Sequence, residues 1–191
     1  MTLLDHYLTE FTCGSDQRAN DAALQLAHSD SELAPVFQAL LAHPDSEARW
    51  WAVRALAESK DDQALKLLPT ALNDPDSTVS QCAALALRQR PDPRAIPTLV
   101  EMLGSRDALL ARLAGDALAA AGQSATPALQ EVMVSGSRAQ RFQAVRVLAL
   151  IGDQCTIPLL FEALEDPSPW IEYWANEGLE RMGIGMTFFI P

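Results

Sequence analysis

The sequence has little that would send the chain into a membrane or out of the cell. No charge-free apolar run approaches the roughly 20 residues that a membrane-spanning helix needs. The opening residues, MTLLDHYLTEF, contain two acids and neither lysine nor arginine, so we expect no secretory signal and no transit peptide. The cysteines are odd in number and widely spaced (Cys13, Cys82 and Cys155), which is typical of free thiols in a reducing compartment. We therefore expect a cytoplasmic protein.

Clustered catalytic or metal-ligating residues are also lacking. His6, His28 and His43 are scattered, and none is followed by glutamate. Zinc sites need clustered Cys and His side chains, and phosphate loops or nucleophile elbows need glycine motifs that are missing from this sequence. We predict no catalytic residue, no metal and no cofactor, and the sequence favours a protein that is not an enzyme.

Basic residues are scarce. The chain has 14 Lys and Arg against 25 Asp and Glu, and its net charge of −11 repels a nucleic-acid backbone unless the cations are clustered. β-Branched and aromatic residues are few, whereas Ala and Leu dominate, which favours helix over sheet. Because 49% of the residues are apolar, a substantial core is possible.

What the sequence does contain is an internal repeat of 30 or 31 residues. The aligned copies are HPDSEARWWAVRALAE (43–58), DPDSTVSQCAALALRQ (74–89), SRDALLARLAGDALAA (105–120), GSRAQRFQAVRVLALI (136–151) and PSPWIEYWANEGLERM (167–182). Two columns, four residues apart, are invariant (Ala52, Ala83, Ala114, Ala144, Ala175; Leu56, Leu87, Leu118, Leu148, Leu179). This spacing is one face of an α-helix, where alanine allows close approach and leucine fills the core.

The segments between these copies predict a second set of helices. Pro35, Pro97, Pro127 and Pro158 share a column in which Lys66 replaces proline, and proline is tolerated near a helix start. We predict first helices at 31–43, 61–73, 92–104, 123–135 and 153–165, and second helices at 46–58, 77–90, 108–121, 138–151 and 169–182. The residue before each second helix should cap it through a side-chain oxygen (Asp45, Asp76, Asp107, Ser137 and Ser168).

We expect three regions along the chain. Residues 1–29 would form a degenerate extra helix pair, because Ala22 and Leu26 fit the alanine and leucine columns and terminal repeats are often atypical. Residues 30–182 would hold the five repeats. Gly183 would end the last helix, and the apolar tail, 183–191, would either cap the array or pair with a partner strand.

The unit DPDSTVSQCAALALRQRPDPRAIPTLVEML resembles the short bacterial HEAT-like repeat named after phycobilisome lyases, and GDQCTIPLLFEALEDPS repeats its last element. The resemblance covers roughly residues 30–182. It implies an all-α, right-handed superhelix of about five helix pairs plus the N-terminal pair, with the second helices lining the concave side. Proteins of this class serve as scaffolds, bilin-lyase subunits, a DNA glycosylase group and an iron hydroxylase, so the resemblance alone does not assign a function.

The outward face of the second helices is aromatic and basic. Counting from position zero (Ala48, Val79, Leu110, Gln140, Ile171), position two points away from the core (Trp50, Gln81, Arg112, Phe142, Tyr173). Position three flanks the core, so we interpret Trp51 and Trp174 as packing residues. Aromatics and arginine are enriched at binding hot spots. We therefore predict a partner-binding face made of Trp50, Arg49, Arg54, Arg112, Arg141, Phe142, Arg146 and Tyr173. The alternative is that such arginines only pair with acids of neighbouring repeats.

Three functions remain open at this point. The favoured one is a non-enzymatic scaffold that binds a partner protein in the concave groove, where the aromatics anchor apolar side chains and the arginines pair with carboxylates. A bilin lyase or chaperone-like subunit would use the same residues for a tetrapyrrole, and EARWWAVRALA (47–57) is similar to lyase subunits. A DNA-binding base-repair protein would need a strongly basic groove and an acid, for which Asp116 is the central candidate, so a nucleic-acid partner is the least favoured. The iron-hydroxylase members use His-Glu pairs, which this chain lacks.

Overall fold

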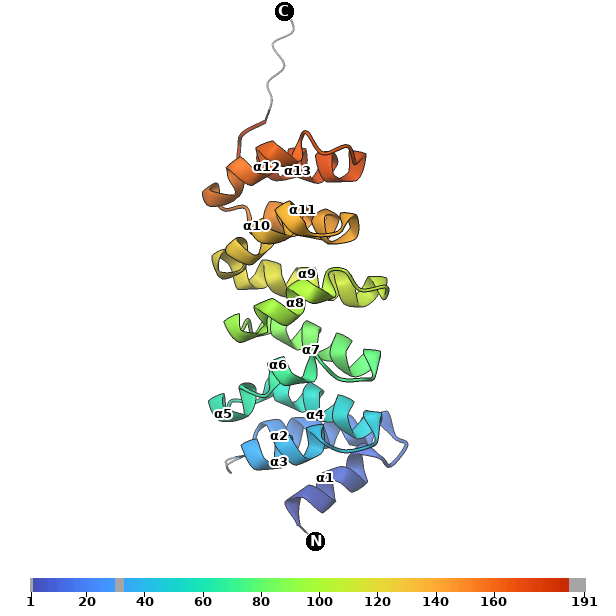
Figure 1. Ribbon diagram of the computed structural model, residues 1–191. Helices are drawn as coiled ribbons and strands as arrows, with labels where there is room; N and C mark the ends of the chain where they lie inside the picture. The colour runs from blue at the N-terminus through green and yellow to red at the C-terminus, as the bar shows by residue number, and fades with distance from the viewer. Residues whose placement is uncertain (1, 30–32, 186–191) are drawn as a thin grey trace, which may run out of the picture. The chain divides into compact units, whose positions relative to one another are not determined.

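The computed structural model describes residues 2–29 and 33–185, and all regular structure in this part of the chain is helical (Figure 1). The predicted all-α repeat fold is confirmed. The chain divides into two compact units, residues 1–90 and 91–191, which we call the N-terminal and C-terminal units. Each unit consists of helix pairs, and the two are described separately below.

The N-terminal unit begins with two helices that precede the first repeat. Its helices are α1 (Leu3–Phe11), α2 (Asp16–Ala27), α3 (Ala34–Leu41), α4 (Ser46–Glu58), α5 (Asp62–Leu65), α6 (Leu68–Ala71) and α7 (Ser77–Gln89). The helix α2 packs against α4, and α4 packs against α7. Ala22 and Leu26, which the repeat pattern placed in the core, are 4% and 0% exposed. The N-terminal pair is therefore a packed part of this unit.

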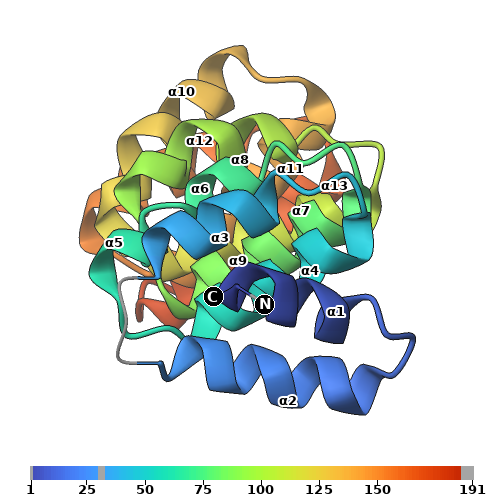
Figure 2. The same ribbon diagram turned by 90° about the horizontal axis from the view of Figure 1, so that it is seen from below.

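The C-terminal unit holds three helix pairs. They are formed by η1 (Pro93–Ala95) and α8 (Ile96–Met102) with α9 (Ala108–Ala121), η2 (Gly122–Ala125) and α10 (Thr126–Ser135) with α11 (Arg138–Ile151), and η3 (Gln154–Thr156) and α12 (Ile157–Ala163) with α13 (Pro169–Arg181). The second helices α9, α11 and α13 pack in series, and the first helix α8 packs against α10. Figure 2 shows α8, α10 and α12 forming one layer of the unit, and the second helices forming the other.

The alanine and leucine columns form the core of both units. Every one of these ten side chains is at most 3% exposed. Small side chains at one position let successive second helices approach, and leucine fills the space between the two layers. The repeat pattern therefore identified the core correctly.

The second helices also have nearly the predicted bounds, since only α7 and α13 end one residue earlier than expected. The first helices are shorter than predicted. In each of the five repeats a proline stands at the second residue of the α-helix (α3, α6, α8, α10 and α12). In the last three repeats, the turn before this helix is a 3₁₀-helix. The prediction of one helix over 61–73 was wrong, because Pro69 has no N–H to donate to Leu65 and the segment divides into α5 and α6.

The predicted caps are confirmed with one exception. The side chains of Asp45, Asp76, Asp107 and Ser137 accept hydrogen bonds from the first N–H groups of α4, α7, α9 and α11. Ser168 occupies the cap position of α13, but its side chain accepts no such bond.

The predicted end of the last helix is also confirmed. Gly183 adopts a positive φ of 74° just after α13, and its N–H donates to the carbonyl of Glu180. Residues 186–191 of the expected apolar tail lie outside the described residues.

Candidate functional site

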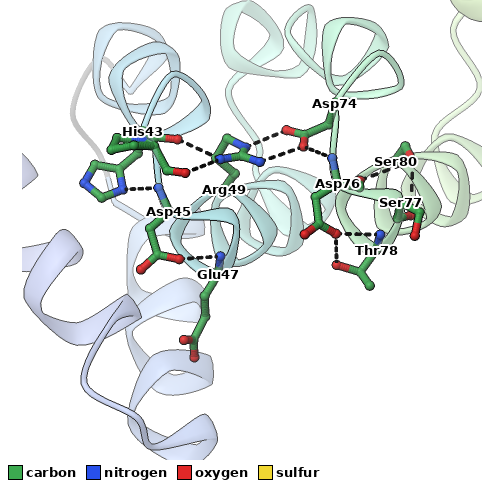
Figure 3. Close-up of polar contacts among 10 residues, drawn as sticks. His43, Asp45, Glu47, Arg49, Asp74, Asp76, Ser77, Thr78 and Ser80 are labelled. Atoms are coloured by element: carbon green, nitrogen blue, oxygen red, sulfur yellow. Dashed lines mark hydrogen bonds and ion pairs between the residues drawn. The ribbon is translucent and has the colours of Figure 1, made fainter.

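Arg49, the fourth residue of α4, joins two successive turns of the N-terminal unit (Figure 3). Its Nη1 donates to the carbonyls of His43 and Pro44, both at 2.9 Å. Its Nε and Nη2 donate to the two carboxylate oxygens of Asp74, at 2.7 and 2.9 Å. The Arg49 and Asp74 side chains are only 10% and 7% exposed, and these bonds raise the pKa of Arg49 above its ordinary value. The guanidinium is fully used inside the fold, so Arg49 acts as a structural clamp.

Arg141 repeats this clamp in the C-terminal unit. Its Nη1 donates to the carbonyl of Gly136 at 3.2 Å, and its Nε donates to Asp166 at 3.4 Å. The side chains of this pair are 28% and 12% exposed. Asp166 also accepts a hydrogen bond from the N–H of Ser168, just as Asp74 accepts one from the N–H of Asp76. Arg141 therefore has the role that the alternative interpretation of the arginines describes.

Arg146 forms a third connection, between α11 and α9. Its Nη1 donates to Asp116 at 2.9 Å, and its Nη2 donates to the carbonyl of Arg112 at 3.2 Å. A Cβ atom on Gly115 would lie 2.5 Å from that Nη2, so a larger residue there would displace the guanidinium from this position. Asp116, the acid that a base-repair function would require, therefore forms an ion pair with Arg146. Arg54 pairs with Glu58 within α4 at 2.9 Å and stays partly exposed.

The two adjacent tryptophans of α4 have different environments, as the repeat register predicts. Trp51 is 7% exposed and stacks on Phe11 of α1, with ring centroids 6.5 Å apart. Trp50 is half-buried and meets Trp51 edge to face at 4.8 Å. Trp50 also lines a shallow cavity of about 390 Å³, whose other walls include the acids Asp16 and Glu47.

A larger and more apolar cavity lies at the N-terminal ends of α11 and α13. It measures about 640 Å³ and is lined by Arg138, Ala139, Phe142, Ser168 and Trp170, which we call the aromatic pocket. Trp170 is 68% exposed, and Phe142 is half-buried. Arg138 is exposed, and its guanidinium donates a long hydrogen bond to the Ser168 hydroxyl, at 3.5 Å. The pocket combines two aromatic walls with a cation at its edge.

Other exposed side chains of the C-terminal unit, on its second helices and on the turn before α9, have the same character. Tyr173 of α13 is 53% exposed and Leu109 of α9 is 52% exposed. Arg106 and Arg112 are also exposed, and in the part of the chain that the structure describes neither they nor Arg138 form an ion pair. The aromatic and leucine side chains of such a surface can contact an apolar side chain of a ligand, and its arginines can bind carboxylates nearby.

The predicted binding residues therefore fall into two groups. Arg49, Arg141 and Arg146 are used in clamps between repeats. The side chains of Arg54, Trp50, Arg112, Phe142 and Tyr173 reach the surface, the first two in the N-terminal unit and the others in the C-terminal unit.

The sequence reasoning overlooked Trp170 and Arg138. Trp170 stands three residues before Tyr173 and so shares its helix face, and this spacing was the available signal. Both residues precede position zero of their helices, whereas the predicted face begins at position one with Arg49 and Arg141.

Within residues 2–29 and 33–185, no three His, Cys, Asp or Glu side chains gather as metal ligands. The same residues include no helix of the length and hydropathy that a bilayer requires.

Comparisons with known proteins agree with this repeat architecture. The family model for HEAT repeats matches residues 33–119. An engineered protein of known structure is 24% identical, with 97% of this chain and 100% of that chain covered and a TM-score of 0.51. A designed armadillo repeat protein is 19% identical, with coverage of 94% and 99% and a TM-score of 0.50. A second one, solved in complex with the peptide (KR)4, is 17% identical, with coverage of 95% and 100% and a TM-score of 0.52.

No curated protein matches the sequence. At identities this low, the likeness to the solved structures concerns the fold alone. Residues 33–119 match the HEAT repeat family, and the shared helical-repeat architecture agrees with an all-α solenoid fold of this chain.

Proposed function

We propose that this protein is a non-enzymatic scaffold that binds a segment of a partner protein on the second helices of its C-terminal unit. The observation that carries the proposal is the aromatic pocket, in which Phe142 and a Trp170 that is 68% exposed face a cavity of about 640 Å³. Trp and Tyr dominate binding hot spots because they bury a large apolar area with few rotatable bonds. Covering Trp170 would remove costly apolar surface from water.

The free arginines indicate the charge of the ligand. Arg106, Arg112 and Arg138 are exposed and have no carboxylate partner among the described residues. A guanidinium matches a carboxylate in a two-pronged geometry. The proposed ligand is therefore a peptide segment that carries an aromatic or large apolar residue next to Asp or Glu.

The likeness to a designed armadillo repeat protein solved with a bound peptide supports the general role, because that protein and this chain share a helical-repeat fold. Its peptide is (KR)4, whereas the arginines around the aromatic pocket favour an acidic ligand. Rigid packing of the second helices keeps the pocket residues ordered before binding, which lowers the entropy lost on association.

The proposal narrows the face expected from the sequence. It keeps Arg112, Phe142 and Tyr173, and it adds Trp170 and Arg138. Arg49, Arg141 and Arg146 are left out because their guanidinium groups are bound inside the fold.

A peptide titration tests this function. The probe is a fluorescein-labelled peptide of alternating Glu and Phe, and the readout is fluorescence anisotropy with the full chain. Removal of a hot-spot tryptophan costs about 2 kcal/mol or more, so Trp170→Ser should weaken binding by about thirtyfold. Arg138→Gln should weaken it several-fold and flatten its salt dependence.

Leu85→Ser is the matched control, because Leu85 is also an exposed large apolar residue (43%) but lies on α7 of the N-terminal unit. Equal binding by the parent protein and the Trp170→Ser variant would overturn the proposal. If the peptide does not bind while the absorption spectrum of added biliverdin shifts, the pocket is a tetrapyrrole site and the scaffold proposal is wrong.

A further inference from the structure

A second groove of the C-terminal unit lies on the opposite layer, between the first helices α10 and α12. Its volume is about 320 Å³. Met133, Leu159 and Ala163 provide apolar lining, together with Val134, which is 82% exposed. Phe161 of α12 is 46% exposed in the same layer. Met133 and Val134 keep part of the apolar lining of the groove in contact with water, so another molecule can dock on it.

The carboxylates of this groove are free to meet a ligand. Glu162 and Glu165 line it, both are exposed, and neither forms an ion pair among the residues that the structure describes. The third acid, Asp166, is already held by Arg141 and by the N–H of Ser168. The charge of the groove is therefore carried by two glutamates beside an apolar lining.

The N-terminal unit contains the same groove in a different chemical form. Between α3 and α6 lies a cavity of about 390 Å³, in which Gln38, Leu41, Leu67 and Ala71 correspond to Gln130, Met133, Leu159 and Ala163. Asp74 likewise corresponds to Asp166, but at three further places the N-terminal groove has neutral or smaller residues. Ala42 stands for Val134, Thr70 for Glu162 and Asn73 for Glu165.

This comparison separates what the fold needs from what it does not. The helix pair packs in the same way with Thr70 and Asn73, so the two glutamates are not required to form the groove. The C-terminal groove differs in that a larger apolar side chain, Val134, and two carboxylates stand on the same surface. A surface that combines apolar contacts with negative charge fits a ligand that presents both of the complementary features.

We propose that the groove between α10 and α12 is a second docking surface, and that it binds a cationic segment of a partner protein, with an apolar side chain on Val134 and Met133 and Lys or Arg paired with Glu162 and Glu165. This proposal does not rest on the aromatic pocket, which lies on other helices and favours acidic ligands. A scaffold with both surfaces could hold two partners of opposite charge.

The test uses the full chain and a fluorescein-labelled peptide of four Lys-Leu units, with anisotropy as the readout. The variant Glu162→Thr/Glu165→Asn installs the residues of the N-terminal groove. Exposed ion pairs are worth about 0.2–1 kcal/mol each, so the loss of two should weaken binding by about two- to thirtyfold. Val134→Ala, again the residue of the N-terminal groove, should weaken binding several-fold.

Glu172→Gln/Glu180→Gln is the control variant, because it removes the same charge from exposed positions on α13. It should change the affinity less than twofold. A peptide of four Lys-Ser units should bind at least about fivefold more weakly than the Lys-Leu peptide, because it cannot use the apolar lining.

Equal losses in the two double variants would mean that a cationic peptide only senses the net charge of the chain, and would overturn the proposal. Equal binding of the Lys-Leu and Lys-Ser peptides, or no binding of either, would also overturn it. Trp170→Ser should leave Lys-Leu binding unchanged, so this groove and the aromatic pocket can fail or succeed separately.

Discussion

The clamp between Arg49 and Asp74 makes a quantitative prediction about stability. In Asp74→Ala, the Arg49 guanidinium stays in a site where its side chain is 10% exposed, with two carbonyl partners but no counter-charge. Removing one partner of a buried ion pair costs about 3–5 kcal/mol. Because the carbonyls of His43 and Pro44 still accept hydrogen bonds, we expect a value near the lower end, about 3 kcal/mol.

The corresponding pair of the C-terminal unit is the internal control. Asp166→Ala removes a weaker bond of 3.4 Å to an Arg141 side chain that is 28% exposed and can turn to water. Because this ion pair is partly exposed, its loss should cost less than that of a buried pair. We expect Asp166→Ala to lower the free energy of unfolding by about 1–2 kcal/mol. Urea unfolding of the full chain, followed by far-UV circular dichroism and tryptophan fluorescence, measures both values.

A double-mutant cycle isolates the pair itself. Arg49→Met removes the buried charge and keeps most of the side-chain volume, so Asp74→Ala should cost far less in that background. The expected coupling energy is about 2 kcal/mol. An Asp74→Ala variant within 1 kcal/mol of the parent, or an Asp166→Ala variant that costs at least as much, would refute this account of the clamp.

Two further predictions concern single side chains. Trp51→Ala should lower the free energy of unfolding by about 3–5 kcal/mol, because it empties a site that is 7% exposed beside Phe11. Trp50→Ala should lower it by under about 2 kcal/mol. Similar melting temperatures for the two variants would contradict the assignment of Trp51 to the core and Trp50 to the surface. Burial raises the pKa of the Cys82 thiol to about 11, so at pH 8 iodoacetamide should alkylate Cys82 about a hundredfold more slowly in the native chain than in urea. The alkylation rate of the native chain should rise about tenfold per pH unit. Peptide mass mapping measures both rates, and equal native and unfolded rates would show that Cys82 is not protected.

The core and the second helices could be predicted because they depend only on local pattern. Ala114 and Leu118 are four residues apart on one helix, and each is fully buried by neighbours that repeat the same pattern. The first helices were harder to predict. Pro69 lies outside the proline column, and its effect on Leu65 depends on a single missing N–H rather than on periodicity.

The binding face was harder still, because an arginine on a helix surface can serve either a partner or the fold. The choice for Arg146 depends on Asp116, thirty residues away in the sequence, and on the space left by Gly115. Periodicity places Arg146 on the outer face of α11, but it does not say that the neighbouring helix offers a carboxylate at the right height. Only the packing of α9 against α11 decides this.

The repeats nevertheless contain a signal that separates the two roles. Position one of the second helices reads Arg49, Ser80, Ala111 and Arg141 in the first four repeats. The turn residue that follows each of them by 25 positions reads Asp74, Ser105, Gly136 and Asp166. Arginine is present only where the next turn supplies an acid.

Where arginine occurs only in the repeats that also supply an acidic partner, its role is structural. Trp170 has no such partner among the described residues, and the residues at its place in the other repeats are Glu47, Thr78, Leu109 and Ala139. A large side chain that occurs once in five repeats, stays 68% exposed and lines a cavity does not serve the repeat itself. In a chain built from near-copies, positions that depart from the shared pattern without an internal partner are where a function specific to this protein should be sought.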